Sequence, residues 1–314
     1  MLNIRERIEG GIYGLLVGDA LGVPYEFYEQ WQIPPLTEIE FHTPRGFKPS
    51  HSGIAPGTWS DDGAQALVLL DSLLTCGKLD IDHLARGMVR WYQEGYMAVD
   101  NLLFDVGIQT KQAILQLKLG VKTELAARRD ERANGNGSLM RVLPLVLWHK
   151  GEDAELVHDA HQQSIVTHGH LRSQVCCAFY CLWARYMFNN HPDPWGKAIV
   201  SLRSIYGEDS PGYGELMESI RPNDNIEPSG SGYVVETLRA AKWSMDYNST
   251  YELVVKAAVS LGGDTDTIAC VAGGIAGIKG GVGAIPTRWL DNLRGKHIVQ
   301  PLIESLIVWR SSTI

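Results

Sequence analysis

Long stretches of the chain repeat apolar residues at intervals of three and four, and this pattern most limits the possible folds. Leu67, Leu70 and Leu74 are one example, because this spacing places all three side chains on one helix face. The same pattern predicts helices over 4–22, 61–76, 81–94, 99–119, 139–149, 152–164, 171–188, 232–246, 250–260 and 266–279. Alternating strand patterns are scarce. The sequence therefore predicts an all-α fold, with residues 1–314 in a single compact multi-helix domain.

Composition excludes several classes of protein. The chain has 314 residues, 45% hydrophobic and 20% charged, as in an ordinary globular protein with a sizeable core. A formal net charge of −8 argues against a nucleic-acid-binding surface. Residues 1–14 lack the apolar core and cleavage site of a signal peptide, and no apolar run is long enough to span a membrane. We therefore expect a cytoplasmic monomer without membrane attachment.

The five cysteines show no metal-binding or disulfide spacing, since no CxxC pair occurs. Cys176, Cys177 and Cys181 lie in an apolar helical stretch, where we expect them to be buried core residues.

Glycine recurs every four residues in two of the predicted helices. Gly14, Gly18 and Gly22 belong to the first, and Gly273 and Gly277 to the last. Each interior glycine costs a helix about 1 kcal/mol, so a compensating interaction is expected. Close helix packing and a ligand lying against bare backbone both explain the pattern, and we favour packing.

Two long segments, 27–57 and 206–231, are rich in proline, glycine and polar residues and fit no helix pattern. Loops of this length in a compact domain are usually functional lids or mobile segments. Both flank acidic clusters, which favours the interpretation as lids.

The first acidic cluster, Ser60-Asp61-Asp62, comes directly before an apolar helix. By itself it needs no function, because Thr58, Ser60 and Asp61 suit a helix cap and acids are favoured in a first turn.

The second cluster, Asp264-Thr265-Asp266-Thr267, indicates more than capping. It follows Gly262-Gly263, which permits a tight turn, and its alternate carboxylates can converge on one point. Together the two clusters supply four carboxylates and three hydroxyls, an oxygen-only set that Mg²⁺ or Mn²⁺ prefers. The sequence thus predicts a metal-dependent enzyme.

Other polar residues near glycine are candidates for the same site. Asp19 falls inside the first predicted helix, where we expect a buried, structural carboxylate. Glu26 follows the end of that helix, at the start of segment 27–57, and could reach a metal or a water. In Asn134-Gly135-Asn136-Gly137-Ser138, alternating Asn and Gly could offer N–H groups to an anion, although the spacing matches no established phosphate loop. Of His168 and His170, we expect one to contact a ligand, because no partner supports zinc.

Seven ordered segments give a specific resemblance: GDALGVPYE, WSDDGAQAL, FDVGIQT, NGNGSLMR, THGH, SGYVVETLRAA and LGGDTDT. In this order they resemble the ADP-ribosylglycohydrolase family, in the bacterial branch related to dinitrogenase reductase-activating glycohydrolase, over about residues 8–285. The resemblance implies an all-α bundle with a two-metal centre of Mg²⁺ or Mn²⁺ in a cleft.

The resemblance also assigns roles to individual residues. One ion would be held by Ser60, Asp61, Asp62 and Asp266, and the other by Glu26, Asp264, Asp266 and Thr267. The distal ribose and the diphosphate would lie on Asn134, Gly135, Asn136, Gly137 and Ser138, and the adenosine on His168 and Tyr233. Many relatives have Thr where Ser60 stands, which keeps the hydroxyl.

The implied reaction is hydrolysis of the bond between ADP-ribose and an acceptor, most simply arginine on a protein. Glu26 or Asp62 would take the proton of the attacking water, and Asp105 would assist the departing guanidine. Alternatives are serine-linked ADP-ribose or O-acetyl-ADP-ribose as substrate, another metal hydrolase such as a phosphoesterase, and a non-catalytic ADP-ribose-binding relative.

Overall fold

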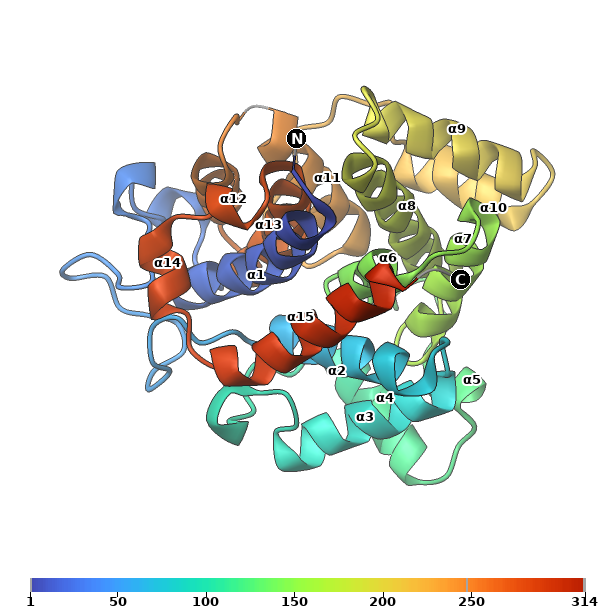
Figure 1. The fold of residues 1–314 in the computed structure, drawn as a ribbon, viewed down its shortest axis with the longest axis horizontal. Coiled ribbons are helices and arrows are strands. Elements are labelled where there is room, and N and C mark those ends of the chain that lie inside the picture. Colours follow the sequence, from blue (N-terminus) through green and yellow to red (C-terminus); the bar gives the residue numbers. More distant parts are fainter. Residues whose placement is uncertain (1, 247, 313–314) are drawn as a thin grey trace.

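The computed structural model describes residues 2–246 and 248–312, and in these ranges helices make up the architecture (Figure 1). The α-helices are Ile4–Gly22 (α1), Asp61–Cys76 (α2), Ile81–Glu94 (α3), Ile108–Lys118 (α4), Thr123–Ala126 (α5), Leu143–Trp148 (α6), Asp153–Ile165 (α7), Leu171–Phe188 (α8), Pro194–Tyr206 (α9), Pro211–Gly214 (α10), Val234–Asp246 (α11), Tyr251–Val259 (α12), Thr265–Gly280 (α13), Thr287–Asn292 (α14) and Lys296–Ser311 (α15). Short 3₁₀ or π turns cover Val23–Tyr25, Gln30–Gln32, Leu36–Glu38, Val99–Asn101, Glu215–Ile220 and Val282–Ala284. No extended strand occurs in the described ranges, which confirms the all-α prediction.

Helices α1 and α13 form the centre of the fold and run antiparallel with their backbones in contact (Figure 1). A Cβ at Gly14 would lie 2.4 Å from the carbonyl oxygen of Gly273, and one at Gly18 would lie 2.1 Å from that of Ala269. A Cβ at Gly22 would lie 2.3 Å from the Cα of Asp266. The glycine spacing therefore serves close helix packing, as expected, and it brings the C-terminal end of α1 against the start of α13.

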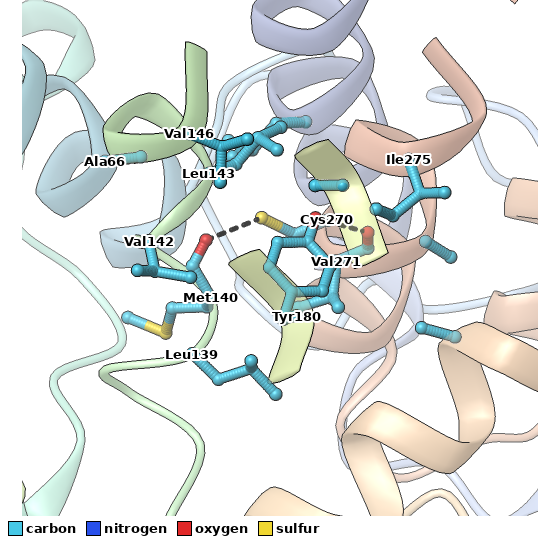
Figure 2. Close-up of a cluster of buried hydrophobic side chains, with 14 of the residues drawn as sticks. Ala66, Leu139, Met140, Val142, Leu143, Val146, Tyr180, Cys270, Val271 and Ile275 are labelled. Atoms are coloured by element: carbon cyan, nitrogen blue, oxygen red, sulfur yellow. Dashed lines mark hydrogen bonds between the residues drawn. The ribbon is translucent and has the colours of Figure 1, made fainter. Parts of the chain in front are cut away.

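The core continues from α13 onto α6 and α8 (Figure 2). Tyr180 of α8 donates its hydroxyl to the carbonyl oxygen of Val271 over 2.9 Å, and the thiol of Cys270 points to the carbonyl of Met140. Leu143 packs beside them. Cys176, Cys177 and Cys181 are buried with free thiols, which confirms their structural role.

Several predicted boundaries agree with the structure, and others do not. The predicted helices 4–22, 61–76, 81–94 and 171–188 match α1, α2, α3 and α8. The helix predicted over 99–119 is wrong in its first half, because Asp100, Asn101 and Asp105 have positive φ angles of 56°, 54° and 48°, and α4 begins only at Ile108. Left-handed backbone cannot continue a right-handed helix.

Two further predictions need correction. Segment 206–231 is not one long loop, since Pro211–Gly214 and Glu215–Ile220 form helical turns that pack on α8. The apolar spacing does not predict helices α9 and α15, and α15 lies across α1 and α2 (Figure 1).

None of the helices in the described residues has the length and apolar character needed to cross a bilayer.

Candidate metal centre and substrate cleft

A cleft of about 960 Å³ opens where the starts of α2 and α13 meet. Its walls come from the starts of these two helices, from residues 26–27 after α1, and from the segments 105–110, 128–137 and 230–233. Segments that are far apart in the chain therefore contribute to one concave surface, the usual form of a small-molecule site.

The first acidic cluster is held by helix capping and by α1. Ser60 is the N-cap of α2, and its hydroxyl accepts a hydrogen bond from the N–H of Asp62 at 3.2 Å. Asp19 accepts hydrogen bonds from the N–H groups of Ser60 and Gly63, at 2.9 and 2.8 Å. The buried, structural role expected for Asp19 is confirmed, and Asp61 and Asp62 remain available for the cleft.

The second acidic cluster follows a sharp turn. Gly262 and Gly263 have φ angles of 72° and 68°, which glycine adopts without strain. The turn is tied by hydrogen bonds from the N–H of Gly263 to the carbonyl of Tyr28 and from that of Phe27 to the carbonyl of Gly263, both 2.7 Å. Asp264 is the N-cap residue of α13.

Carboxylates of the two clusters converge, as the sequence predicted. Oxygen atoms of Glu26, Asp264 and Asp266 all lie within 4.8 Å of one another. The hydroxyl of Thr267 donates to Asp62 Oδ1 at 3.3 Å, which links the start of α13 to the start of α2.

Two carboxylate oxygens in this cluster have no hydrogen-bond partner. Asp62 Oδ2 and Asp266 Oδ2 are both buried and unsatisfied. A buried oxygen of this kind is costly unless it binds a cation or a proton. The donor set consists of oxygen atoms, so the residues fit hard divalent cations such as Mg²⁺ or Mn²⁺.

The electrostatics of the cluster lead to the same conclusion. Burial, and then neighbouring carboxylates, raise the pKa values of Asp61, Asp62 and Asp266 well above the usual range. Burial and the charges of Asp105 and Asp264 raise the pKa of Glu26 to about 10. The raised pKa values show that the protein supplies too little positive charge to keep these acids ionised, whereas nearby cations would stabilise their ionised forms.

Asp61 is oriented by a buried network that the sequence did not suggest. Gln65 Nε2 donates to Asp61 Oδ2 at 2.7 Å, and Arg141 Nη1 donates to Gln65 Oε1 at 3.2 Å. Arg141 is fully buried and also donates to the hydroxyl of Thr167 at 2.7 Å. The (i, i+4) spacing of Asp61 and Gln65 on α2 was the available sequence signal.

His51 is a second residue that sequence reasoning missed. Its Nε2 lies 2.5 Å from Glu26 Oε2, and atoms of His51, Glu26 and Asp105 lie within 4.8 Å of one another. Burial lowers the pKa of His51. It comes from segment 27–57, where no pattern distinguishes it from other polar residues.

The segment 134–138 borders the cleft with most of its polar groups already engaged. The N–H of Gly135 donates to Gln109 Oε1 at 2.7 Å, and the N–H of Asn136 donates to the carbonyl of Gly232 at 3.2 Å. Asn136 Nδ2 donates to Asp264 Oδ2 at 2.7 Å. Asn134 and Gly137 line the cleft, whereas the hydroxyl of Ser138 is fully buried against that of Ser164.

The two candidate histidines have different positions. His168 lines the cleft, and burial lowers its pKa to about 3, so its ring is neutral. His170 is the N-cap of α8 and accepts from the N–H of Arg172. Tyr233 also lines the cleft, with its hydroxyl 3.1 Å from Arg172 Nη1. Arg128 and Arg132, which the sequence analysis did not select, are cationic residues of the same wall.

The fold and this site define an all-helical protein with a carboxylate-rich cleft suited to divalent cations. Comparison with known proteins gives the family: the sequence pattern of the ADP-ribosylglycohydrolases matches residues 1–312, and the chain belongs to this family.

Individual relatives are similar over most of their length. The chain is 29% identical to the ADP-ribosylarginine hydrolase Tri1 of Serratia proteamaculans, over 96% of this chain and 79% of that protein. It is 28% identical to the ADP-ribosyl-[dinitrogen reductase] glycohydrolase of Rhodospirillum rubrum, over 93% of this chain and 91% of that protein. A solved structure titled ADP-ribosylglycohydrolase-related protein complex matches with a TM-score of 0.79 and 30% identity, covering 100% of both chains. The chain is thus a hydrolase of the glycohydrolase type.

Proposed function

We propose that this protein hydrolyses the N-glycosidic bond between ADP-ribose and an arginine side chain of a modified protein, with two Mg²⁺ or Mn²⁺ ions as cofactors. The observation that carries the proposal is that Glu26, Asp264 and Asp266 converge beside a cleft that Asp62 also lines, with buried oxygens of Asp62 and Asp266 unpartnered. Similarity to an ADP-ribosylarginine hydrolase and to a dinitrogen reductase glycohydrolase supports the substrate class.

The proposed ligands are those that the resemblance assigned. Ser60, Asp61, Asp62 and Asp266 would hold one ion, and Glu26, Asp264, Asp266 and Thr267 the other. Such ions, when bound, orient the distal ribose and a water and stabilise developing charge.

Residues of the cleft would bind and position the substrate. The cleft volume of about 960 Å³ is large enough for ADP-ribose. Asn134, Gly135, Asn136 and Gly137 would position the ribose and diphosphate, with Ser138 buried behind them against Ser164, and His168 and Tyr233 would position the adenosine. Arg132 adds positive charge on the same wall, which suits a diphosphate, and Arg128 lies beside it in an ion pair with Asp130.

Proton transfer would involve carboxylates at the acidic part of the cleft. Glu26 or Asp62 would accept the proton of the attacking water. Burial, and then the charge of Asp264, raise the pKa of Asp105, which favours its protonated form. A protonated Asp105 could donate to the departing guanidine, a basic leaving group that needs this assistance.

The test is a release assay with arginine-linked and serine-linked ADP-ribose side by side, with and without Mg²⁺ or Mn²⁺. We expect metal-dependent release from arginine, and we expect Asp266→Asn to lose both metal binding and turnover. Glu304→Gln, at an exposed ion pair with Arg5, is the control and should keep both. Full activity of Asp266→Asn would contradict the proposal. Release from serine alone, or binding of ADP-ribose without release, would support the alternative functions.

A further inference from the structure

Phe27 lies at the cleft with its side chain mostly exposed, so this position buries little of its apolar surface. Its side chain is 70% exposed, and its backbone has a φ angle of 64°, in the left-handed region. For a non-glycine residue this conformation costs on the order of 1 kcal/mol. The hydrogen bond from the Phe27 N–H to the carbonyl of Gly263 maintains it. A strained backbone that presents an aromatic ring to a cleft indicates a role in ligand binding.

The ring of Phe27 is the outermost of three neighbouring rings. It lies 5.8 Å from the ring of His51, which lies 5.2 Å from that of Phe104. These rings adjoin two acids of the cleft, because ring nitrogen atoms of His51, the middle ring, lie within 4.8 Å of carboxylate oxygens of Glu26 and Asp105. One part of the cleft thus combines aromatic surface with carboxylates.

This combination is suited to a guanidinium group. A guanidinium is a weakly hydrated planar cation that stacks on aromatic faces, and its edge donates hydrogen bonds to carboxylates. A serine hydroxyl has neither the charge nor the plane, and an acetyl group is planar but uncharged, so both would gain less from the ring than a guanidinium.

We propose that Phe27 determines specificity for the acceptor, with its ring face stacked on the guanidinium of the arginine to which ADP-ribose is attached. The proposal rests on the proposed hydrolysis of arginine-linked ADP-ribose and adds the residue that distinguishes this acceptor from neutral ones.

Three variants test whether the aromatic face of Phe27 is needed, as distinct from its apolar volume or from exposed aromatic surface elsewhere. Phe27→Leu keeps apolar volume and a Cβ but removes the aromatic face, and Phe27→Tyr keeps the face. Trp31→Ala removes another exposed aromatic side chain, 82% exposed and outside the cleft, and serves as the control. Circular dichroism and the melting temperature verify that each variant folds.

The first measurement is turnover of ADP-ribosylated arginine and of O-acetyl-ADP-ribose by the metal-loaded protein. We expect Phe27→Leu to lower kcat/KM for the arginine substrate about tenfold, chiefly through KM, with no change for O-acetyl-ADP-ribose. Phe27→Tyr and Trp31→Ala should behave like the unsubstituted protein. Equal losses on both substrates, or no loss on either, would overturn the proposal.

The second measurement does not require turnover. Agmatine carries a guanidinium without a protein, and its binding to the protein loaded with Mn²⁺ and ADP-ribose can be followed by calorimetry. We expect about tenfold weaker binding by Phe27→Leu. Unchanged binding, or no binding by the unsubstituted protein, would refute the acceptor subsite. If the unsubstituted protein cleaves neither substrate, the proposed function fails, while agmatine binding still decides the role of Phe27.

Discussion

Asp19 on α1 accepts a hydrogen bond from the backbone N–H of Ser60 at 2.9 Å, so one helix caps the start of another. The same carboxylate accepts from the N–H of Gly63 at 2.8 Å. Asp19 is fully buried and its partners belong to the turn that carries Asp61 and Asp62. A structural carboxylate therefore fixes the position of the candidate metal ligands.

Replacing Asp19 with Ala should destabilise the protein by about 2–4 kcal/mol, because two buried N–H groups lose their acceptor. Chemical denaturation measures this loss, with Glu304→Ala on the surface as the control. An unchanged free energy of unfolding would show that water or another group caps α2 instead.

Replacing Gly18 with Ala should separate α1 from α13, since the new Cβ would lie 2.1 Å from the carbonyl oxygen of Ala269. Two packed backbones cannot move aside as a flexible side chain can. We therefore expect the free energy of unfolding to fall by about 1–3 kcal/mol or more. Gly214→Ala is a matched control, because no atom would lie within 4 Å of a Cβ at this position and its φ angle is −57°. A melting temperature for Gly18→Ala equal to that of the control would contradict the close packing.

Removal of divalent cations should lower the melting temperature at neutral pH. Asp61, Asp62 and Asp266 are buried together with raised pKa values, so without a cation they must either bind protons or repel one another as anions, and a bound cation stabilises their ionised forms in the folded state. A thermal shift assay after chelation, followed by addition of Mg²⁺ or Mn²⁺, measures the effect. Ligand binding at 100 times Kd adds about 2.7 kcal/mol. Asp266→Asn should abolish the recovery, and a recovery of normal size in that variant would exclude Asp266 as a ligand.

The pH dependence of stability should include a contribution from His161. Burial lowers its pKa from 6.5 to about 4, and its Nε2 lies 2.8 Å from the Tyr206 hydroxyl. Between these values the unfolded chain binds more protons than the folded one, so stability falls as pH decreases from about 6.5 towards 4. His161→Gln should lose this part of the slope, whereas His42→Gln, at an exposed position, should keep it. Identical slopes for all three proteins would refute the assignment.

The sequence by itself determined the local features of this protein. Apolar spacing gave the bounds of α1, α2, α3 and α8, because a helix face depends on neighbours three and four residues away. Glycine spacing predicted close helix packing by both α1 and α13, and acids at two helix starts predicted an oxygen-rich site that includes Asp62 and Asp266. In each case residues close in the chain carried the signal.

Only the tertiary structure decided how distant irregular segments meet. Asp105 lies in left-handed backbone rather than in the helix predicted over 99–119, and His51 reaches Glu26 from segment 27–57. The exposed ring of Phe27 likewise depends on a hydrogen bond to Gly263, 236 residues away in a sequence of 314. Such positions depend on long-range packing and backbone hydrogen bonds, for which the spacing of neighbouring residues carries no information.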